Sequence, residues 1–298
     1  MSSNEKSRSQ RPKLPPWIRI RVGSGGGREE VGAILKGLRL NTVCAGAQCP
    51  NLNECWHRGT ATFMILGDSC TRNCRFCAVP HTAKPAPPEA DEPVRLAKAA
   101  AKMNLTYVVV TSVTRDDLPD GGASQFAAVI RELHKELPAA GIEVLTPDFN
   151  AEKDALYKVL EAGPTVFNHN VETVRRLSEQ IRSKATYDRS LQVLKMAADS
   201  AYDIPVKSGL MVGLGETDEE VVATIDDLRK SGVSILTIGQ YLPPSKEHYP
   251  LDRYVEPEKF AEWGEYAKKI GFEFVASAPL VRSSYNAGEL VSCRRKDS

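Results

Sequence analysis

The chain has 298 residues, of which 42% are hydrophobic and 26% are charged, and its formal net charge is +1. This composition is ordinary for a globular enzyme of one large or two small domains. The near-zero net charge gives no reason to expect a protein that binds nucleic acid or a membrane surface through a strong excess of basic residues. The sequence also has no apolar run long enough for a membrane span and no apolar leader of the secretory type.

Residues 1–22 differ from the rest of the chain because they carry six basic side chains, one acidic side chain and three prolines. We interpret them as a solvated tail that ends in an extended arm. An arm that packs on the domain or meets an acidic partner is the sharper alternative, and an organellar transit peptide is a weaker one. After this tail, residues 29–38 place apolar side chains on one face and predict a short helix.

Six of the seven cysteines fall into two triplets. The first has C-x4-C-x5-C spacing and consists of Cys44, Cys49 and Cys55, in a loop rich in Gly, Asn and Pro. Thiolates two to five residues apart can converge on one metal centre. This clustering does not fit a secreted disulfide framework, so we expect a reducing compartment, the cytoplasm.

The second triplet has C-x3-C-x2-C spacing and consists of Cys70, Cys74 and Cys77, just after a buried strand predicted at 62–66. Three ligands are informative because a structural zinc site is closed by four, whereas a four-iron cluster held by three thiolates leaves one iron open. A labile disulfide set or a zinc knuckle is the alternative. His81 is the nearest candidate for a fourth ligand, and we do not favour it.

The C-x3-C-x2-C spacing, with Phe76 before the last cysteine, resembles the signature of radical S-adenosylmethionine enzymes. In that superfamily the open iron chelates the amino and carboxylate groups of S-adenosylmethionine. Electron transfer from the cluster then cleaves this cofactor to a 5′-deoxyadenosyl radical. The resemblance therefore implies that the second triplet holds a catalytic cluster.

Beyond this triplet, apolar strand-like runs alternate with helix-like segments. Further strands are predicted at 107–113, 143–145, 166–168, 206–212, 235–241 and 273–276. Helices are predicted at 93–103, 124–137, 151–162, 171–182, 187–201, 218–231 and 257–270. The alternation indicates an α/β fold with a parallel sheet, and the strands are apolar on both faces, as a helix-covered sheet requires. Six or seven such units fit a barrel or partial barrel, in which chemistry lies at the carboxyl ends of the strands.

Polar segments follow five of the predicted strands, at 111–122, 168–173, 209–216, 240–245 and 278–285. We expect S-adenosylmethionine to be contacted from these strand ends and from the cysteine loop. The residues assigned to this role are Phe76, Thr111, Ser112, Asn168, Asn170, Glu172, Gly213 and Gln240. The glycine-rich segment 209–216 is explained equally well as a tight turn, and we interpret His169 as a supporting residue.

The two triplets, the segments 111–122 and 168–173, and the C-terminal run Arg282-Ser-Ser-Tyr285 together resemble the lipoyl synthase family. The resemblance extends over about residues 15–289. The C-x3-C-x2-C triplet alone is shared by a large superfamily. Its pairing with the first triplet and with Arg-Ser-Ser-Tyr is characteristic of this one family.

The resemblance implies a partial (β/α)6 TIM-like barrel at residues 62–277. It also implies an N-terminal extension, 1–61, and a C-terminal extension, 278–298, which together carry an auxiliary iron–sulfur cluster. The implied cofactors are two 4Fe-4S clusters and S-adenosylmethionine. Cys70, Cys74 and Cys77 would hold the catalytic cluster. Cys44, Cys49, Cys55 and a serine would hold the auxiliary one. We assign Ser284 as that ligand, keep Ser283 as the alternative, and interpret Cys293 as a bystander thiol.

The implied activity is that of a sulfurtransferase, which inserts two sulfur atoms at the sixth and eighth carbons of an octanoyl chain on a lysine of a lipoyl carrier protein, with the auxiliary cluster as sulfur donor. The implied partners are octanoylated lipoyl domains of 2-oxoacid dehydrogenases and the glycine cleavage H protein, an electron donor such as ferredoxin or flavodoxin, and a protein that repairs the cluster. Methylene hydrogens are not acidic, so removing them requires a radical rather than a base. An apolar tunnel would stabilise the bound chain by about 0.8 kcal/mol for each methylene.

Two rival functions share parts of this pattern. Biotin synthase and the methylthiotransferases have the C-x3-C-x2-C run but place their second-cluster ligands elsewhere, so the triplet at 44–55 argues against them. An iron–sulfur electron carrier or a zinc-stabilised binding module belongs to another class, and it needs far less than a barrel-sized chain with polar strand ends.

Overall fold

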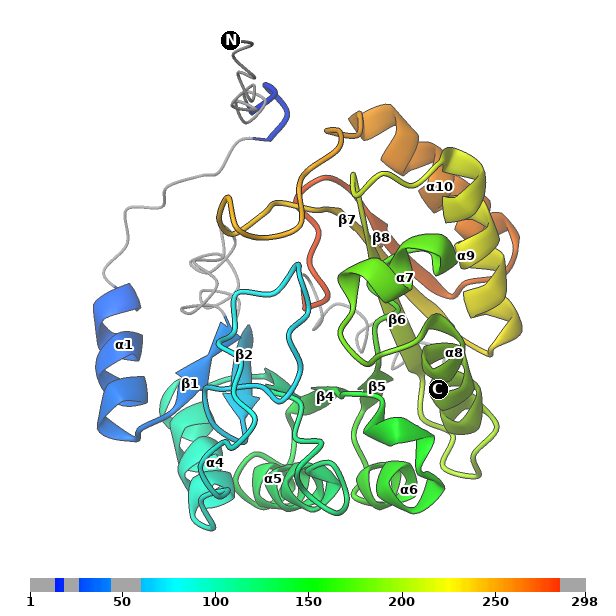
Figure 1. Cartoon of the computed structure of the whole chain (residues 1–298). Coiled ribbons are helices and arrows are strands. Elements are labelled where there is room, and N and C mark those ends of the chain that lie inside the picture. The colour runs from blue at the N-terminus through cyan, green and yellow to red at the C-terminus, as the bar shows by residue number, and fades with distance from the viewer. Residues whose placement is uncertain (1–13, 19–26, 44–59, 285–298) are drawn as a thin grey trace, which may run out of the picture.

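The computed structural model describes residues 14–18, 27–43 and 60–284, so Cys44, Cys49, Cys55 and Cys293 lie outside the described residues. One sheet with the strand order β1 to β8 organises this part of the chain (Figure 1). Its strands are β1 (Asn41–Thr42), β2 (Thr60–Ile65), β3 (Tyr107–Ser112), β4 (Gly141–Leu145), β5 (Val166–Asn168), β6 (Val206–Val212), β7 (Ile235–Gln240) and β8 (Phe274–Ser277). β1 pairs antiparallel with β2, and β2 to β8 are all parallel.

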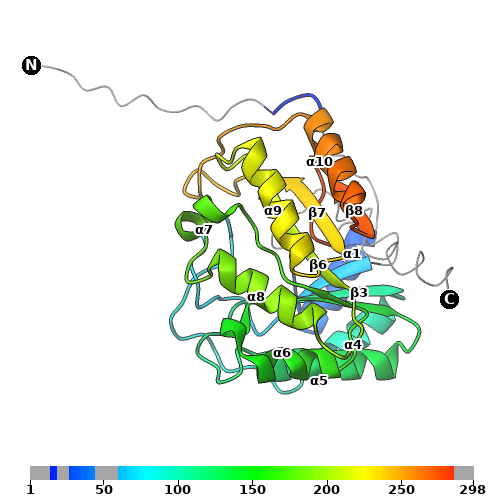
Figure 2. The ribbon, with the colours of Figure 1, turned by 90° about the vertical axis from the view of Figure 1, so that its right-hand side faces the viewer.

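Helices connect the parallel strands and cover the outer face of the sheet (Figures 1 and 2). They are α4 (Glu92–Lys102), α5 (Ala123–Glu136), α6 (Lys153–Glu161), α7 (Arg175–Ile181), α8 (Tyr187–Ala198), α9 (Asp218–Lys230) and α10 (Pro257–Lys269), with a 3₁₀ turn, η1 (Phe149–Ala151), before α6. A further helix, α1 (Gly27–Gly37), precedes β1. In the described residues, six strand–helix units run from β2 to α10, and β8 follows them. The sheet is not closed, which confirms the predicted partial (β/α)6 barrel.

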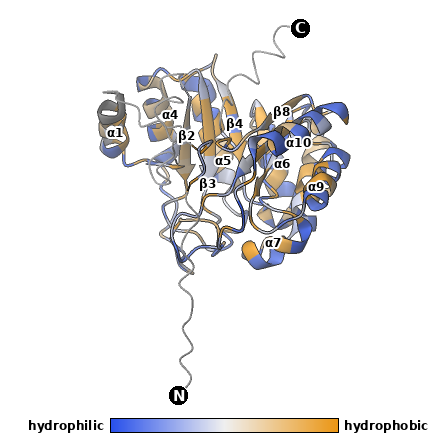
Figure 3. Cartoon of the chain, turned by 90° about the horizontal axis from the view of Figure 1, so that it is seen from above, coloured by the Kyte–Doolittle hydropathy of each residue, from blue (hydrophilic) through white to orange (hydrophobic). Residues whose placement is uncertain are grey.

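The core lies between the sheet and its helices. Val108 and Val110 of β3 and Phe126 and Ile130 of α5 are all fully buried in one apolar cluster. Seen from above, hydrophobic residues gather on the strands and hydrophilic ones on the outer faces of the helices (Figure 3). No helix in the described residues is long and apolar enough to cross a membrane.

Most predicted elements agree with the structure to within a few residues, but the helix predicted at 171–182 begins only at Arg175. Glu172 has a positive φ of 66°. Its backbone extends the sheet by donating to Gly209 O at 3.1 Å and accepting from Met211 N at 2.9 Å. The helical periodicity of the sequence does not reveal this pairing. The short antiparallel strand β1 was not predicted either.

The barrel interior below the strand ends is polar. Lys207 Nζ lies 2.8 Å and 3.0 Å from the two carboxylate oxygens of Glu143. The same carboxylate accepts from Asn168 Nδ2 at 3.0 Å and from the Tyr107 hydroxyl at 3.3 Å. All four side chains are buried, and we call them the floor. Side chains two residues apart share a face of a strand, so the floor lies beneath Leu145 of β4 and Gly209 of β6.

Candidate functional site

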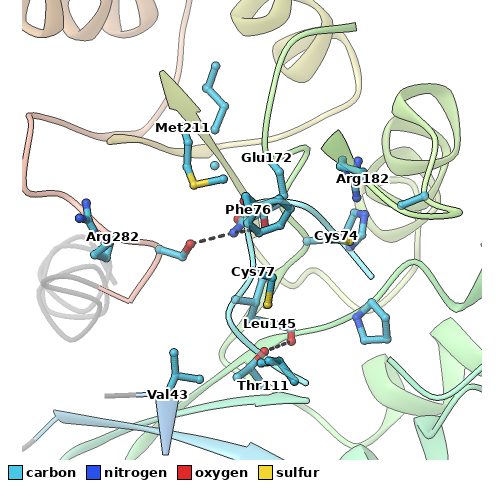
Figure 4. Close-up of a pocket in the computed structure, with 18 of the residues that line it drawn as sticks. Val43, Cys74, Phe76, Cys77, Thr111, Leu145, Glu172, Arg182, Met211 and Arg282 are labelled. Atoms are coloured by element: carbon cyan, nitrogen blue, oxygen red, sulfur yellow. Dashed lines mark hydrogen bonds between the residues drawn. The ribbon is translucent and has the colours of Figure 1, made fainter. Parts of the chain in front are cut away.

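A cavity of about 400 Å³ lies at the carboxyl ends of the parallel strands, above the floor (Figure 4). Its walls come from the loop after β2, the ends of β3, β4, β6 and β7, the loop after β5, and residues 281–283. Cys70, Cys74 and Cys77 all line it. The fold therefore brings the second cysteine triplet to the place where a barrel of this kind carries its chemistry.

The backbone of the cysteine loop is held by hydrogen bonds at several points. Cys70 N donates to Pro80 O at 2.8 Å, and Thr82 N donates to Cys70 O at 2.9 Å, which forms a parallel bridge around His81. Cys77 N donates to Cys74 O at 3.1 Å. His81 Nδ1 lies 3.1 Å from Cys70 O, so this ring is engaged with the backbone. His81 is not among the residues that line the cavity.

The three cysteines are free thiols with environments suited to iron. Cys70 Sγ accepts hydrogen bonds from the backbone N–H groups of Arg72 at 3.4 Å and of Thr114 at 3.3 Å. Burial raises the pKa of Cys74, and it raises the pKa of Cys77 to about 11, so metal binding must displace a proton from these thiols. Within the part of the chain that the structure describes, no three His, Cys, Asp or Glu side chains surround a single-ion position. Three thiols on one wall of a roomy cavity fit a four-iron cluster with an open position.

Arg72, inside the cysteine motif, ties the loop to two neighbouring strand ends. Its guanidinium makes paired contacts with the Asp116 carboxylate at 2.8–2.9 Å and with the Asp148 carboxylate at 2.7–2.9 Å. Arg189 adds a contact to Asp148 at 3.3 Å. Burial opposes ionisation of Asp148, but the hydrogen bonds and charge of Arg72 outweigh it and hold the pKa of Asp148 at about 2. The network therefore fixes the cysteine loop before any metal is present.

Arg182 places a buried positive charge at the cavity, on the other side from Arg282 in Figure 4. Its Nη1 donates to Ser190 Oγ at 2.8 Å, and Ser190 Oγ lies 2.9 Å from His169 Nε2. His169 Nδ1 is 2.9 Å from Thr146 O, so this nitrogen carries the proton. Burial, with Arg182 nearby, lowers the pKa of His169 to about 4. His169 is thus a neutral, fully bonded support for Arg182.

The remaining walls combine unpartnered polar atoms with apolar surface. Ser112 Oγ, Thr146 Oγ1 and Asn170 Oδ1 are buried without a hydrogen-bond partner among the described residues. The apolar lining includes Val43, Met64, Phe76, Leu145 and Met211. A buried polar atom without a partner costs free energy, so these atoms are suited to a ligand with donors and acceptors. The cavity therefore offers both polar groups suited to a cofactor and apolar surface suited to an aliphatic chain.

The structure brings most of the predicted cofactor residues to this cavity. Those that line it are Phe76, Thr111, Ser112, Asn170, Glu172 and Gln240. Burial raises the pKa of Glu172. Thr111 Oγ1 donates to Leu145 O at 2.9 Å, and the Gln240 amide bonds backbone groups, including Val212 O and Val255 N. These two side chains already have partners within the fold.

Two predicted cofactor residues lie elsewhere. Asn168 belongs to the floor and is not among the cavity-lining residues. Gly213 has a φ of 96°, and a Cβ there would overlap Gln240 Nε2 and Arg253 O. Gly213 N donates to Glu216 Oε1 at 2.6 Å. The surroundings of Gly213 therefore match the alternative interpretation of the glycine-rich segment, a tight turn.

The predicted ligands of the auxiliary cluster are only partly covered by the described residues. Ser283 lines the cavity, whereas Ser284 is described but is not among the lining residues. Cys44, Cys49 and Cys55 lie outside the described residues. Val43, which directly precedes Cys44, lines the same cavity as Ser283.

Sequence reasoning missed Arg72 and Arg182. Arg72 had a signal, because it lies between the first two cysteines of the motif. Arg182 had none, since its position next to Cys74 arises from the path of the chain after α7.

Comparison with known proteins places the chain among close relatives. Residues 64–228 match the model of the Radical SAM superfamily. A protein of Caldicellulosiruptor saccharolyticus named lipoyl synthase is 56% identical over 277 residues, which cover 93% of this chain and 97% of the relative. A lipoyl synthase of Rubrobacter xylanophilus is 51% identical over 282 residues, which cover 95% of this chain and 88% of the relative.

Solved structures resemble the fold at low sequence identity. The FeFe-hydrogenase maturase HydG from Carboxydothermus hydrogenoformans has a TM-score of 0.57 at 14% identity, with 90% of this chain and 79% of the other covered. Methylornithine synthase (PylB) has a TM-score of 0.54 at 14% identity, with 83% of this chain and 82% of the other covered. At these identities the likeness concerns the fold alone.

Proposed function

The chain belongs to the lipoyl synthase family, within the radical S-adenosylmethionine superfamily, and we propose how its own residues divide the family's reaction among them. That reaction inserts two sulfur atoms into an octanoyl chain on a lysine of a lipoyl carrier protein. The enzyme is a sulfurtransferase that uses S-adenosylmethionine and 4Fe-4S clusters. The main support for this assignment of roles is that three free cysteines line one cavity at the strand ends.

Cys70, Cys74 and Cys77 hold the catalytic cluster in this proposal. When bound, the cluster and S-adenosylmethionine supply a radical that removes hydrogen atoms from unactivated methylenes, which no side-chain base can do. The residues around the cysteines bind and orient the cofactor. Arg182 would hold its carboxylate and Glu172 its ammonium group, because a basic and an acidic side chain both line the cavity that contains the cysteines.

The octanoyl chain lies along the apolar wall formed by Met64, Leu145, Met211 and Val43. Burial of methylenes on this wall stabilises the bound chain by about 0.8 kcal/mol each. The same wall excludes water from the reacting carbons, which protects a radical from side reactions. Met211 and Leu145 come from different strands, so the wall is set by the barrel and not by one loop.

The auxiliary cluster is assigned to Cys44, Cys49, Cys55 and Ser284. It would be carried by the extensions 1–61 and 278–298 on either side of the barrel at 62–277. The support for this assignment is that Val43 and Ser283, the immediate neighbours of two of these ligands, line the cavity that holds the other triplet. A cluster bound there would stand close to the acyl chain and could donate its sulfur.

The substrates are octanoylated lipoyl carrier proteins, such as the lipoyl domains of 2-oxoacid dehydrogenases and the glycine cleavage H protein. We propose ferredoxin or flavodoxin as the electron donor and a separate protein for repair of the auxiliary cluster. We place the reaction in the cytoplasm, because a reducing compartment preserves oxygen-sensitive clusters.

An anaerobic turnover assay tests this function. The reconstituted protein is mixed with an octanoyl-lysine peptide, S-adenosylmethionine and dithionite, and mass spectrometry follows the peptide and 5′-deoxyadenosine. We expect a peptide that has gained two sulfur atoms, and no sulfur in the product of a Cys74→Ala control. Cleavage of S-adenosylmethionine with no sulfur in the peptide, at full iron content, would contradict the proposal.

A further inference from the structure

The segment after β8 crosses the top of β7 and reaches the cavity. Ala278 N donates to Ile238 O at 3.2 Å, and Gln240 N donates to Pro279 O at 3.2 Å. Val281 is buried, and Ser283 lines the cavity. Residues 278–284, which we call the C-terminal strap, are therefore part of the cavity wall.

Gly239 makes this crossing possible. It is an inward position of β7, and a Cβ built there would overlap Val281 O and lie 3.2 Å from the Val281 carbonyl carbon. These are backbone atoms, so a side chain at 239 could be accommodated only by moving the strap. The missing side chain therefore sets how closely the strap approaches the sheet.

Ser283 anchors the far end of the strap. Asn170 Nδ2 donates to Ser283 Oγ at 2.7 Å and lies 3.3 Å from Glu172 Oε1. Asn170 is 6% exposed, so the bond is largely shielded from water. The strap is thus tied to the same loop that presents Glu172 beside the catalytic cysteines (Figure 4).

Ser284 differs from its neighbour, because its side chain makes no hydrogen bond to any of the described residues. A hydroxyl already bonded to a buried amide is poorly placed to become a metal ligand, whereas one that the fold leaves unbonded has an oxygen to offer. The two adjacent serines therefore have different surroundings.

We propose that Ser283 is a positioning residue: through Asn170, and through the close approach at Gly239, it fixes the C-terminal strap over the cavity so that Ser284 is presented to the auxiliary cluster. The proposal rests on the proposed function for the role of Ser284. The anchoring itself concerns only contacts within the described residues, and it can be tested without any cluster.

The first test uses hydrogen–deuterium exchange on cluster-free protein. Ser283→Ala and Asn170→Ala should each speed exchange of the strap amides about fivefold, the change expected from one lost hydrogen bond. Ser283→Thr should restore slow exchange. Ser277→Ala is the matched control, because its hydroxyl bonds Phe260 O outside the cavity. Unchanged exchange in both Ser283→Ala and Asn170→Ala overturns the proposal.

A glycine pair gives an independent check on the same anchoring. Gly239→Ala should also speed exchange in the strap, because the new methyl group displaces Val281. Gly32→Ala on α1 is its control, since a Cβ there meets nothing within 4 Å. Equal exchange in the two glycine variants overturns the role given to Gly239.

The second test uses reconstituted protein. Ser284→Ala should change the Mössbauer spectrum of the auxiliary cluster in full, whereas Ser283→Ala should change it in only a fraction of the molecules and raise the 5′-deoxyadenosine released per sulfur inserted. A changed spectrum in Ser283→Ala with an unchanged one in Ser284→Ala overturns the proposal. If the wild-type protein inserts no sulfur, the proposed function is refuted. The exchange experiments would still test the anchoring of the strap, because they use cluster-free protein.

Discussion

The floor of the barrel and its mouth, by which we mean the cavity at the carboxyl ends of the strands, are both polar. They differ in whether their buried polar atoms have hydrogen-bond partners. On the floor, Lys207 and Glu143 form an ion pair, and the Glu143 carboxylate also accepts hydrogen bonds from Asn168 Nδ2 and the Tyr107 hydroxyl. Among the polar side-chain atoms of the floor, only Asn168 Oδ1 lacks a partner in the described residues. At the mouth, the buried oxygens Ser112 Oγ, Thr146 Oγ1 and Asn170 Oδ1 have no hydrogen-bond partner among the described residues.

This difference suggests that the floor supports the fold and that the mouth binds a ligand. Buried polar groups that satisfy each other stabilise a particular packing, whereas buried groups left open raise the free energy of the empty protein. The open groups line the same cavity as Cys70, Cys74 and Cys77, so we infer that a ligand completes their hydrogen bonds. Substitutions at the floor should therefore alter stability, and those at the mouth should alter binding and chemistry.

The largest effect is expected at the mouth. Cys74→Ala should reduce cleavage of S-adenosylmethionine at least ~100-fold, because loss of one of three thiolates disrupts the cluster. The measurement is 5′-deoxyadenosine formed under dithionite, with Cys293→Ala, the predicted bystander thiol, as control. A Cys74→Ala protein that cleaves the cofactor at the wild-type rate would show that the cluster is held elsewhere.

The next effect is expected at the floor. Lys207→Met leaves the Glu143 carboxylate buried and unpaired, which should lower the free energy of unfolding of the cluster-free protein by about 3–5 kcal/mol. Adding Glu143→Leu should recover most of this loss. Urea denaturation of both variants gives the comparison, and a single variant within ~1 kcal/mol of wild type would rule out the paired floor.

His169 sharpens the comparison because it lies at the mouth yet is bonded through both nitrogens. Its pKa is about 4 in the folded protein and about 6.5 when unfolded, so the unfolded state binds a proton first as the pH falls. Stability should therefore decrease by a few kcal/mol between pH 6.5 and 4. The pKa of Asp148 is lower, about 2, so its contribution is lost below this window.

The check is the pH dependence of urea unfolding of the cluster-free protein, compared with His169→Asn. The variant should have a shallower slope between pH 6.5 and 4, whatever its absolute stability. Parallel slopes in the two proteins would mean that another group accounts for the pH dependence.

The smallest stability change is expected for Ser112→Ala. Its hydroxyl has no partner, so removal should change the free energy of unfolding of the cluster-free protein by less than ~0.5 kcal/mol. The same change should weaken binding of S-adenosylmethionine to the reconstituted protein about threefold or more, as expected for one lost hydrogen bond. Equilibrium dialysis measures the binding. A large loss of stability with unchanged binding would reverse the comparison.

The sequence was sufficient for the elements whose pattern is local. The apolar runs predicted β6 and β7 almost to the residue, and the helix predicted at 218–231 is α9, which a capping box between Thr217 and Glu220 begins. Spacing alone grouped Cys70, Cys74 and Cys77, because the motif fits in one loop.

What the sequence did not reveal depends on contacts between distant segments. The late start of α7 follows from pairing of Glu172 with β6, and the partnership of Arg72 with Asp116 and Asp148 joins three loops. The floor does have a signal in the sequence, because Glu143 and Lys207 are charged residues inside otherwise apolar strands. Their mutual pairing required the register of the sheet.

Electron paramagnetic resonance of the reduced catalytic cluster tests the central claim most directly. A variant with Cys44, Cys49 and Cys55 replaced by alanine should keep only the cluster at Cys70, Cys74 and Cys77, with about four irons per chain. We predict that S-adenosylmethionine changes its spectrum, and that ¹⁵N in the amino group of the cofactor adds a hyperfine coupling. A four-iron spectrum that saturating cofactor leaves unchanged would contradict the account.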